Sequence, residues 1–239
     1  MIYSLLLTVL LNAFTASAQT GNVANIVMIR GHEVTVYSGD KKITVDSKQL
    51  PLQLSPGDEV QLGLDSDCEL VFGNKDSMYA GSETLFSVDW YRNNMNSIWL
   101  KYGSLLYRGE SSVAVKASDL SVLSKTGDFM IRFKRSTSEA IILNFGQDIL
   151  VKQGDDEEPY VLKNYRYVKT MSFKNQSKTY GLVNQQKIKG IYDTFRITFT
   201  PNEKDAGLDQ INNNDHKTTT VSPSTKKANI DFMKRTIGL

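Results

Sequence analysis

Hydrophobic and polar residues alternate with a period of two along most of this chain. In residues 129–134, Phe129, Ile131 and Phe133 fall on one face of an extended backbone, and charged side chains fall on the other. This spacing is typical of a β-strand that buries one face. Similar short segments recur between turn signals about every 8–12 residues. The pattern predicts an all-β fold for residues 23–173, a β-solenoid-like or sandwich-like stack of short strands.

Three segments refine this prediction. Residues 86–99 contain several asparagines, which are poor helix formers, and we interpret the segment as a loop between strands. Residues 161–173 are rich in Tyr and Val, and this composition favours a hairpin. Residues 191–199 alternate again, with Phe195 facing inward, so residues 174–200 are predicted to form an additional β-hairpin packed on the main domain.

A weak internal similarity relates two parts of the chain at a constant offset. Each of the following positions in the first copy has a similar residue in the second: Leu62, Asp67, Leu70, Phe72 and Ser77 correspond to Leu123, Asp128, Ile131, Phe133 and Ser138. Strand–turn–strand sequences also produce such matches by coincidence. The sequence therefore leaves open whether the similarity reflects a structural repeat.

Residues 1–18 have the layout of a secretory signal peptide. Residues 2–11 are nearly all apolar, and Ala16, Ser17 and Ala18 form a small-residue cleavage site ahead of Gln19. The apolar run is shorter than the roughly 20 residues that a membrane-spanning helix needs. We expect residues 1–18 to be removed and the rest to be exported, to the periplasm or outside the cell, with no membrane-spanning helix left. The alternative is an uncleaved leader that tethers the chain to the membrane.

The composition changes after Pro201. Residues 202–227 are dominated by Asn, Asp, Lys, Thr and Ser, and such segments bury too little apolar surface to offset the entropy of ordering. We predict that residues 201–239 form a disordered polar tail. Hydrophobic residues return in residues 228–239, where the sequence allows either a short amphipathic helix or a frayed end.

Charge and cysteine content narrow the range of functions. The 28 basic and 26 acidic side chains leave a formal charge of +2, which gives no electrostatic footprint for binding nucleic acid. Cys68 is the only cysteine, so no intramolecular disulfide can form, and we expect it to be a buried residue in a strand.

No residue set indicates a reaction or a bound cofactor. A metal site generally needs three or four ligands, and neither His32 nor His216 has a second histidine nearby in the sequence. No spacing supports a nucleophilic pair of Cys68 with His32. Residues 155–158 are all acidic, but they lack the spacing of a calcium loop and are expected to form a solvated turn. We expect no catalytic residue, no metal ligand and no cofactor.

Aromatic residues provide the best candidate for a recognition surface, since aromatic rings anchor many interfaces. The set consists of Trp90, Tyr91, Trp99, Tyr102 and Tyr107. Trp99 and Tyr102 are separated by an odd number of positions, so they cannot both face inward on one regular strand. The alternative is that these rings close the open end of the β core.

The middle of the chain resembles the FecR family of periplasmic regulators. The resemblance covers about residues 26–152, and its motifs are residues 31–36 (GHEVTV), 54–60 (LSPGDEV), 67–79 (DCELVFGNKDSMY), 98–105 (IWLKYGSL) and the strand–turn–strand pattern of 120–151. Pro56 and Gly57 are suited to a tight turn, because proline fixes φ and glycine tolerates a positive φ. These motifs are folding signals and carry no reaction chemistry.

The resemblance implies a non-enzymatic, β-solenoid-like domain that contacts other proteins. Archetypal members add a cytoplasmic segment that binds a sigma factor and one membrane helix. We expect neither in this chain, and therefore a free-standing exported domain with a scaffold, recognition or regulatory role in the cell envelope and a protein or glycan partner. Two alternatives stay open: a hydrolase or lyase that acts on polysaccharide through a pair of acids, and a membrane-tethered signalling regulator.

Overall fold

The structure of the protein is a computed structural model that describes residues 23–73, 75–91, 95–154, 158–171 and 178–197. The predicted signal peptide (1–18), the polar tail (201–239) with its terminal helix, His216 and most of the acidic run at 155–158 lie outside these ranges.

The described strands form two nine-stranded sheets that share one long strand, β9 (Met95–Arg108). In spatial order, sheet A contains β4 (Leu52–Leu54), β1 (Ala24–Arg30), β6 (Asp67–Phe72), β7 (Ser77–Ala80), β9, β12 (Phe129–Lys134), β13 (Glu139–Asn144), β16 (Arg166–Met171) and β17 (Thr179–Leu182). Sheet B contains β3 (Lys41–Thr44), β2 (Val34–Ser38), β5 (Glu59–Leu62), β8 (Leu85–Tyr91), β9, β10 (Val113–Ala117), β11 (Leu120–Ser124), β14 (Ile149–Gln153) and β15 (Tyr160–Leu162).

Strand β9 crosses from one sheet to the other at Gly103. Its first part pairs with β8 and β10 in sheet B, and its second part pairs with β7 and β12 in sheet A. Gly103 has a φ of +101°, and a Cβ at this position would lie 2.2 Å from Thr84 Oγ1. Only glycine fits both the left-handed backbone and the close approach of Thr84. The β9–β10 pair is parallel, whereas the other strand pairs are antiparallel.

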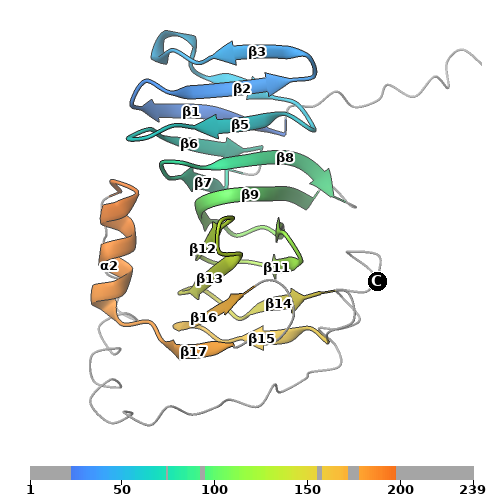
Figure 1. Cartoon of the computed structure of the whole chain (residues 1–239), viewed down its shortest axis with the longest axis vertical. Helices are drawn as coiled ribbons and strands as arrows, with labels where there is room; N and C mark the ends of the chain where they lie inside the picture. The colour runs from blue at the N-terminus through green and yellow to red at the C-terminus, as the bar shows by residue number, and fades with distance from the viewer. Residues whose placement is uncertain (1–22, 74, 92–94, 155–157, 172–177, 198–239) are drawn as a thin grey trace, which may run out of the picture.

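The inner faces of the two sheets enclose one elongated core, so the strands stack as a tall, two-layered ladder (Figure 1). Phe72 and Phe129 both pack on Tyr107, with ring centroids 6.3 and 5.6 Å from its ring. Core residues from both sheets are almost fully buried. The prediction of an all-β, sandwich-like stack is therefore confirmed.

The internal similarity between residues 62–77 and 123–138 corresponds to a repeat of topology. The chain passes through β5, β6, β7, β8 and the two parts of β9, which we call the first unit. It then takes the same path through β11, β12, β13, β14, β15 and β16, which we call the second unit. Each pairing of the first unit (β5–β8, β6–β7, β8–β9, β7–β9) has its equivalent in the second (β11–β14, β12–β13, β14–β15, β13–β16). The match is not perfect, because Leu62 points into the core between the sheets whereas Leu123 points outward from sheet B.

The predicted hairpin at 174–200 is wrong. Strand β17 is followed by a helix, α2 (Gln185–Thr194), which begins at Asn184, whose side chain accepts a hydrogen bond from the Lys187 amide. Within and just after the helix, Ile188, Ile191, Tyr192 and Phe195 are buried at a spacing of three and four residues. This helical spacing overrides the period of two that residues 191–199 also show.

Two smaller predictions are also corrected. Residues 86–99 are not a loop, since most of them belong to β8 and β9. Asparagines cluster where the two strands connect, and their low helix propensity says nothing against the strands beside them. Residues 161–173 do contain strands but no hairpin, because β15 pairs with β14 in sheet B whereas β16 joins β13 in sheet A.

Helix α2 runs along one side of the stack, across the direction of the strands (Figure 1). Its buried side chains pack on outward-facing residues of sheet A, among them Leu106 of β9 and Met130 of β12. The domain therefore has a second, smaller core outside the main one. In the described ranges no helix has the length and apolar character that crossing a bilayer requires.

Candidate docking surface

Trp99 lies on the outer face of sheet B, where 52% of its surface is exposed. Its neighbours along β9, Ile98 and Leu100, point into the core, so the pleat of the strand directs Trp99 outward. Strands pair with β9 on both sides here, with Ser87 of β8 and Lys116 of β10 opposite Trp99. A large aromatic side chain is thus presented to solvent from a backbone that is held in place on both edges.

Charged side chains surround the indole ring. Lys101 Nζ lies 5.4 Å from the ring centroid, within the range of a cation–π contact, and pairs with the Glu59 carboxylate on β5. Lys116 is exposed on the other side. Five residues on five adjacent strands lie opposite one another in register on the outer face: Tyr37, Glu59, Ser87, Trp99 and Lys116. We call this row, together with Lys101, the Trp99 surface.

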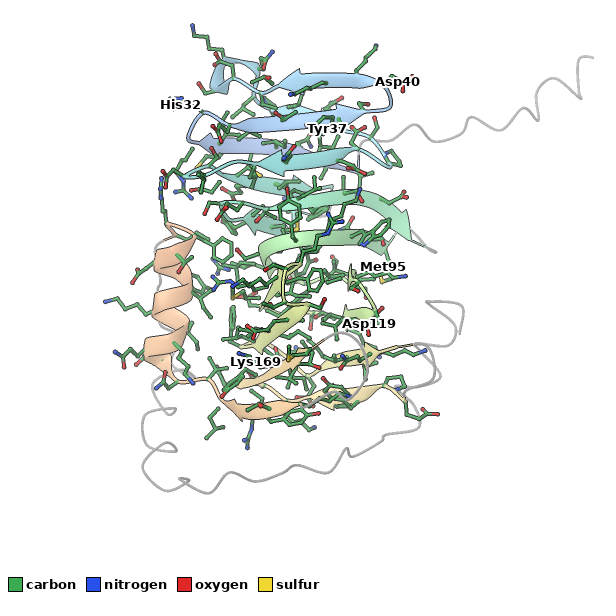
Figure 2. The ribbon with its side chains drawn as sticks, in the orientation of Figure 1. His32, Tyr37, Asp40, Met95, Asp119 and Lys169 are labelled. Atoms are coloured by element: carbon green, nitrogen blue, oxygen red, sulfur yellow. The ribbon has the colours of Figure 1, made fainter. Side chains whose placement is uncertain are left out.

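Tyr37 lies on β2 (Figure 2), where its hydroxyl donates a hydrogen bond to Gln61 Oε1 at 2.9 Å, and Lys42 on the edge strand β3 lies opposite it. The sequence did not single out Tyr37, Glu59 or the two lysines of the Trp99 surface. Their positions depend on pairing between strands that are distant in the sequence, such as β5 and β10, which are connected through β8 and β9. No local pattern indicates such pairing.

Of the other predicted aromatic residues whose side chains the structure describes, none forms an exposed patch with Trp99. Tyr102 is half-buried on β9, next to the crossing point at Gly103. Trp90 and Tyr91 end strand β8, opposite Asn96 and Met95, and their side chains lie outside the described part of the structure. The odd spacing of Trp99 and Tyr102 was informative, because Trp99 is the one that faces solvent.

Including Tyr107 in a contact surface is wrong, because its side chain is 1% exposed. Its hydroxyl donates a hydrogen bond to the buried carboxylate of Asp76, which also accepts one from the Glu110 amide at 2.9 Å. Burial raises the pKa of Tyr107, and the bond to Asp76 adds to the effect. Tyr107 therefore belongs to the core and is not part of an exposed surface.

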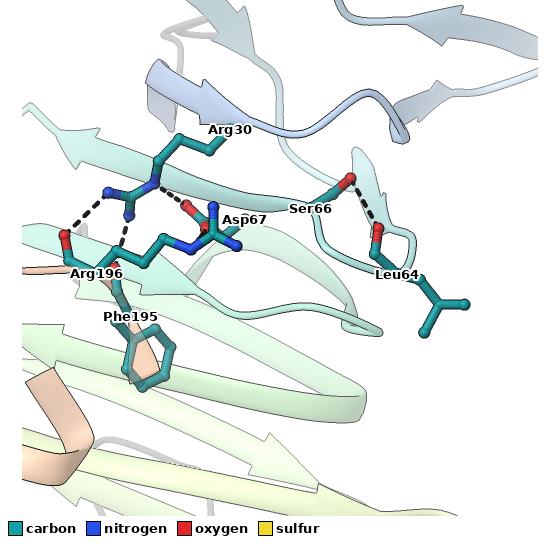
Figure 3. Close-up of polar contacts among 6 residues, drawn as sticks. All are labelled: Arg30, Leu64, Ser66, Asp67, Phe195 and Arg196. Carbon is teal, nitrogen blue, oxygen red and sulfur yellow. Dashed lines mark hydrogen bonds and ion pairs between the residues drawn. The ribbon is translucent and has the colours of Figure 1, made fainter. Parts of the chain in front are cut away.

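A cluster of polar contacts around Arg30, which no sequence pattern indicated, holds the end of α2 against the sheets (Figure 3). Arg30 at the end of β1 donates to Asp67 Oδ1 at 2.6 Å and to the carbonyl oxygens of Phe195 and Arg196 at 2.6 and 3.0 Å. Arg196 in turn places its Nε 3.8 Å from Asp67 Oδ2. One guanidinium thus joins the first unit to residues that follow the helix.

The second unit repeats this arrangement. Asp128, the counterpart of Asp67, pairs with Arg108 at 3.3 Å and accepts a hydrogen bond from the Tyr192 hydroxyl at 3.4 Å. The Arg108 guanidinium also lies 5.2 Å from the centroid of the Tyr192 ring. Burial raises the pKa of Asp128 although Arg108 opposes this effect. We call the Arg30–Asp67 and Arg108–Asp128 pairs the helix clasp.

The match of Asp67 with Asp128 was visible in the sequence, but their partners were not. Arg30 precedes its aspartate by 37 residues and Arg108 by 20, so no common spacing identifies the pairs. The helix that they hold was itself mispredicted. The clasp could be recognised only after the strands had been placed side by side.

The remaining candidates for chemistry have structural roles or lie apart from one another. Cys68 is 1% exposed in β6, as expected, and burial raises the pKa of its thiol. His32 lies in the exposed turn between β1 and β2, at the edge of the stack (Figure 2). Ser66 Oγ accepts a hydrogen bond from the Glu33 amide at 3.0 Å. Among the described residues, no three His, Cys, Asp or Glu side chains converge in a way that could hold a metal ion.

Comparisons with known proteins give one partial similarity of fold. No family model and no curated protein matches the chain. Two crystal structures, at 2.50 and 1.65 Å resolution, of a candidate anti-sigma factor from Parabacteroides distasonis ATCC 8503 superpose on it with a TM-score of 0.49 each. The sequence identities are 10% and 9%. The superpositions cover 55% and 56% of this chain and 62% and 63% of the other chains, so less than two thirds of each neighbour is matched.

Proposed function

We propose that this chain is a non-enzymatic module of the bacterial cell envelope that works by contact, as a scaffold or regulator, and that the Trp99 surface is its docking site. The observation that carries the proposal is the exposure of Trp99 on a strand that is paired on both edges. Tryptophan dominates many binding interfaces because it buries a large apolar area at little cost in conformational entropy. The neighbouring lysines and Glu59 would provide the polar rim that such interfaces have.

The open edges of the sheets are less suitable for docking. Strand β3 ends sheet B, and its first two residues, Lys41 and Lys42, are exposed lysines. Charged side chains on an edge strand oppose strand addition by another chain. The flat outer face of sheet B therefore fits a partner better than this edge.

Two carboxylates that are paired with arginines support a non-enzymatic role. Asp67 pairs with Arg30, which also donates a hydrogen bond to the Phe195 carbonyl oxygen just after α2. Asp128 pairs with Arg108 and accepts a hydrogen bond from the Tyr192 hydroxyl of α2. A carboxylate held in this way stabilises the fold and is not directed at a substrate. Export and the regulatory role rest on other grounds, which are the leader pattern of residues 1–18 and the resemblance of residues 26–152 to the FecR family.

Affinity capture from an envelope extract tests the proposal. The bait proteins are the wild-type chain, Trp99→Ala, and Leu64→Ala as the matched control, since Leu64 is a hydrophobic residue that is 68% exposed in a loop. We expect a defined partner to be retained by the wild type and Leu64→Ala and to be lost at least tenfold with Trp99→Ala. Protease or glycosidase treatment of the extract then distinguishes a protein from a glycan partner.

Two outcomes would reject the proposed docking site. One is equal recovery of the partner by Trp99→Ala and the wild type, and the other is no specific partner under any extraction condition. Turnover of an envelope polysaccharide by the purified chain would instead favour the hydrolase or lyase alternative.

A further inference from the structure

We infer that residues 228–239 of this chain dock on an apolar row that crosses the outer face of sheet B beside the Trp99 surface. The row consists of residues that lie opposite one another in register on four successive strands: Ala114 on β10, Leu123 on β11, Leu150 on β14 and Val161 on β15. On β9 the residue opposite Ala114 is Ser97, and Met95, two positions before it on the same face, joins the hydrophobic cluster. We call the four residues in register, together with Met95, the apolar row.

The apolar row forms a hydrophobic cluster on the outer face of sheet B. Leu123 and Leu150 point outward from the sheet and are 2% and 6% exposed, Met95 is 6% exposed, and Ala114 and Val161 are partly buried. Within the described ranges, this hydrophobic cluster contains side chains of sheet B alone, and no helix packs on it. The next row along the same strands is polar, with Lys116, Ser121 and Lys152 at the outward positions. The apolar character is thus confined to one strip.

The opposite face of the domain shows how this chain covers such a strip. At the same level of the stack, outward apolar residues of sheet A, such as Leu106 and Met130, are covered by α2, which lies across the strands. The cover is therefore a short amphipathic helix supplied by the chain's own C-terminal part. An equivalent helix on sheet B would make the two outer faces alike.

Residues 228–239 have the pattern that such a helix needs. Ile230, Met233 and Ile237 are spaced by three and four residues, so they would share one helical face. Twelve helical residues are about 18 Å long, and the row from β9 to β15 spans four strand spacings, or about 19 Å. The preceding residues 198–227 are polar and can extend to about 100 Å, so the segment can reach either face.

A double-mutant experiment on the full-length chain tests this docking. The first change is Leu123→Ala in the apolar row, and the second is a triple tail variant, Ile230→Asp/Met233→Asp/Ile237→Asp. If the tail covers the row, the triple variant should lower the urea midpoint and raise the fluorescence of a bound hydrophobic dye several-fold. Leu123→Ala should then shift the midpoint by less than half as much in the tail variant as in the wild type.

The matched control is Ile188→Ala under α2, which should shift the midpoint equally with either tail because α2 packs on the other face. Additive effects of Leu123→Ala and the tail variant, or unchanged dye binding, would overturn the inference. So would a doubled mass in light scattering that persists in the tail variant, because a second copy of the chain would then cover the row. Since the tail variant leaves residues 23–197 unchanged, the test does not depend on a truncated chain that might fail to fold.

Discussion

The two repeated units of this molecule share one topology but differ in their outer faces. In the first unit, outward positions carry Glu59, Gln61 and Ser87 on sheet B, and Glu69 on sheet A, and these face solvent at least in part. In the second unit, Met130, Leu143 and Tyr167 form an apolar group at outward positions of sheet A and pack in the cluster under α2. Inward residues therefore define the path of the chain, whereas outward residues determine which surface each unit presents.

Strand β9 links the units and also marks the change between them. Its part in sheet B carries Trp99, which is exposed, and its part in sheet A carries Leu106, which α2 buries completely. The same strand thus presents a free aromatic residue on one face of the domain and a covered aliphatic residue on the other. This contrast points to the Trp99 surface as the face left free for a partner.

The largest difference between the units should appear when a covered residue is compared with an uncovered one. Met130→Ala, on β12 of the second unit, removes a buried side chain under α2, so we expect a loss of about 2–5 kcal/mol in the free energy of unfolding. Val71→Ala, on the outer face of β6, should cost less than about 1 kcal/mol because that side chain is only partly buried. Urea unfolding of both variants provides the measurement, and equal losses would mean that α2 adds little to the second unit.

The helix clasp should give the next largest effect. Arg30→Ala removes the guanidinium that bonds Asp67, Phe195 and Arg196, so we expect a loss of about 1–3 kcal/mol and faster amide exchange at the end of α2. Arg30→Lys keeps the charge but not the forked geometry and should recover only part of the loss. Arg132→Ala, at an exposed position on β12, is the control and should have little effect. An effect of Arg30→Ala no larger than that of Arg132→Ala would show that the clasp is not needed.

The pH dependence of stability should distinguish the second pair of the clasp. Burial raises the pKa of Asp128 above its ordinary value, so the protonated carboxyl is favoured in the folded state. The stabilisation from this group is complete below the ordinary pKa of about 3.9 and is lost as the pH rises through the raised pKa. Asp128→Asn cannot titrate, so its stability relative to the wild type should increase over that window. Parallel pH profiles of the two proteins would refute the role of burial at Asp128.

Trp99→Ala should have the smallest effect on folding. The side chain is half exposed and fills no cavity, so we expect the free energy of unfolding to change by about 0.5 kcal/mol or less. Thermal or urea unfolding checks this expectation alongside the capture experiment. A loss as large as that of Met130→Ala would mean that Trp99 is a structural residue, and the reason for placing a docking site there would disappear.

The sequence predicted the strands of this fold much better than their partners. The alternation of Phe129, Ile131 and Phe133 identified β12, and the same signal located most of the other strands. Pairing is set by contacts across the two sheets, and so the crossing of β9 at Gly103 and the parallel pair with β10 left no local trace.

The candidate surface was predictable only in part, for a related reason. The odd spacing of Trp99 and Tyr102 indicated that one ring faces outward, but nothing near Tyr107 revealed that Asp76, 31 residues earlier, would hold it in the core. In residues 191–199, two periodicities competed, and the buried surface offered by Leu106 and Met130 decided in favour of the helix. Tertiary contacts of this kind override local propensity.

Photo-crosslinking from position 99 tests most directly whether the outer face of sheet B is the docking site. A photoreactive amino acid replaces Trp99 in the full-length chain in its native envelope, and a second chain carries it in place of Lys41, on the exposed edge strand β3 but out of the row of Trp99. We expect a discrete adduct from position 99 and none from position 41. An adduct from position 41 alone would place the contact at the edge of the sheet, and no adduct from either position would contradict a docking role for this face.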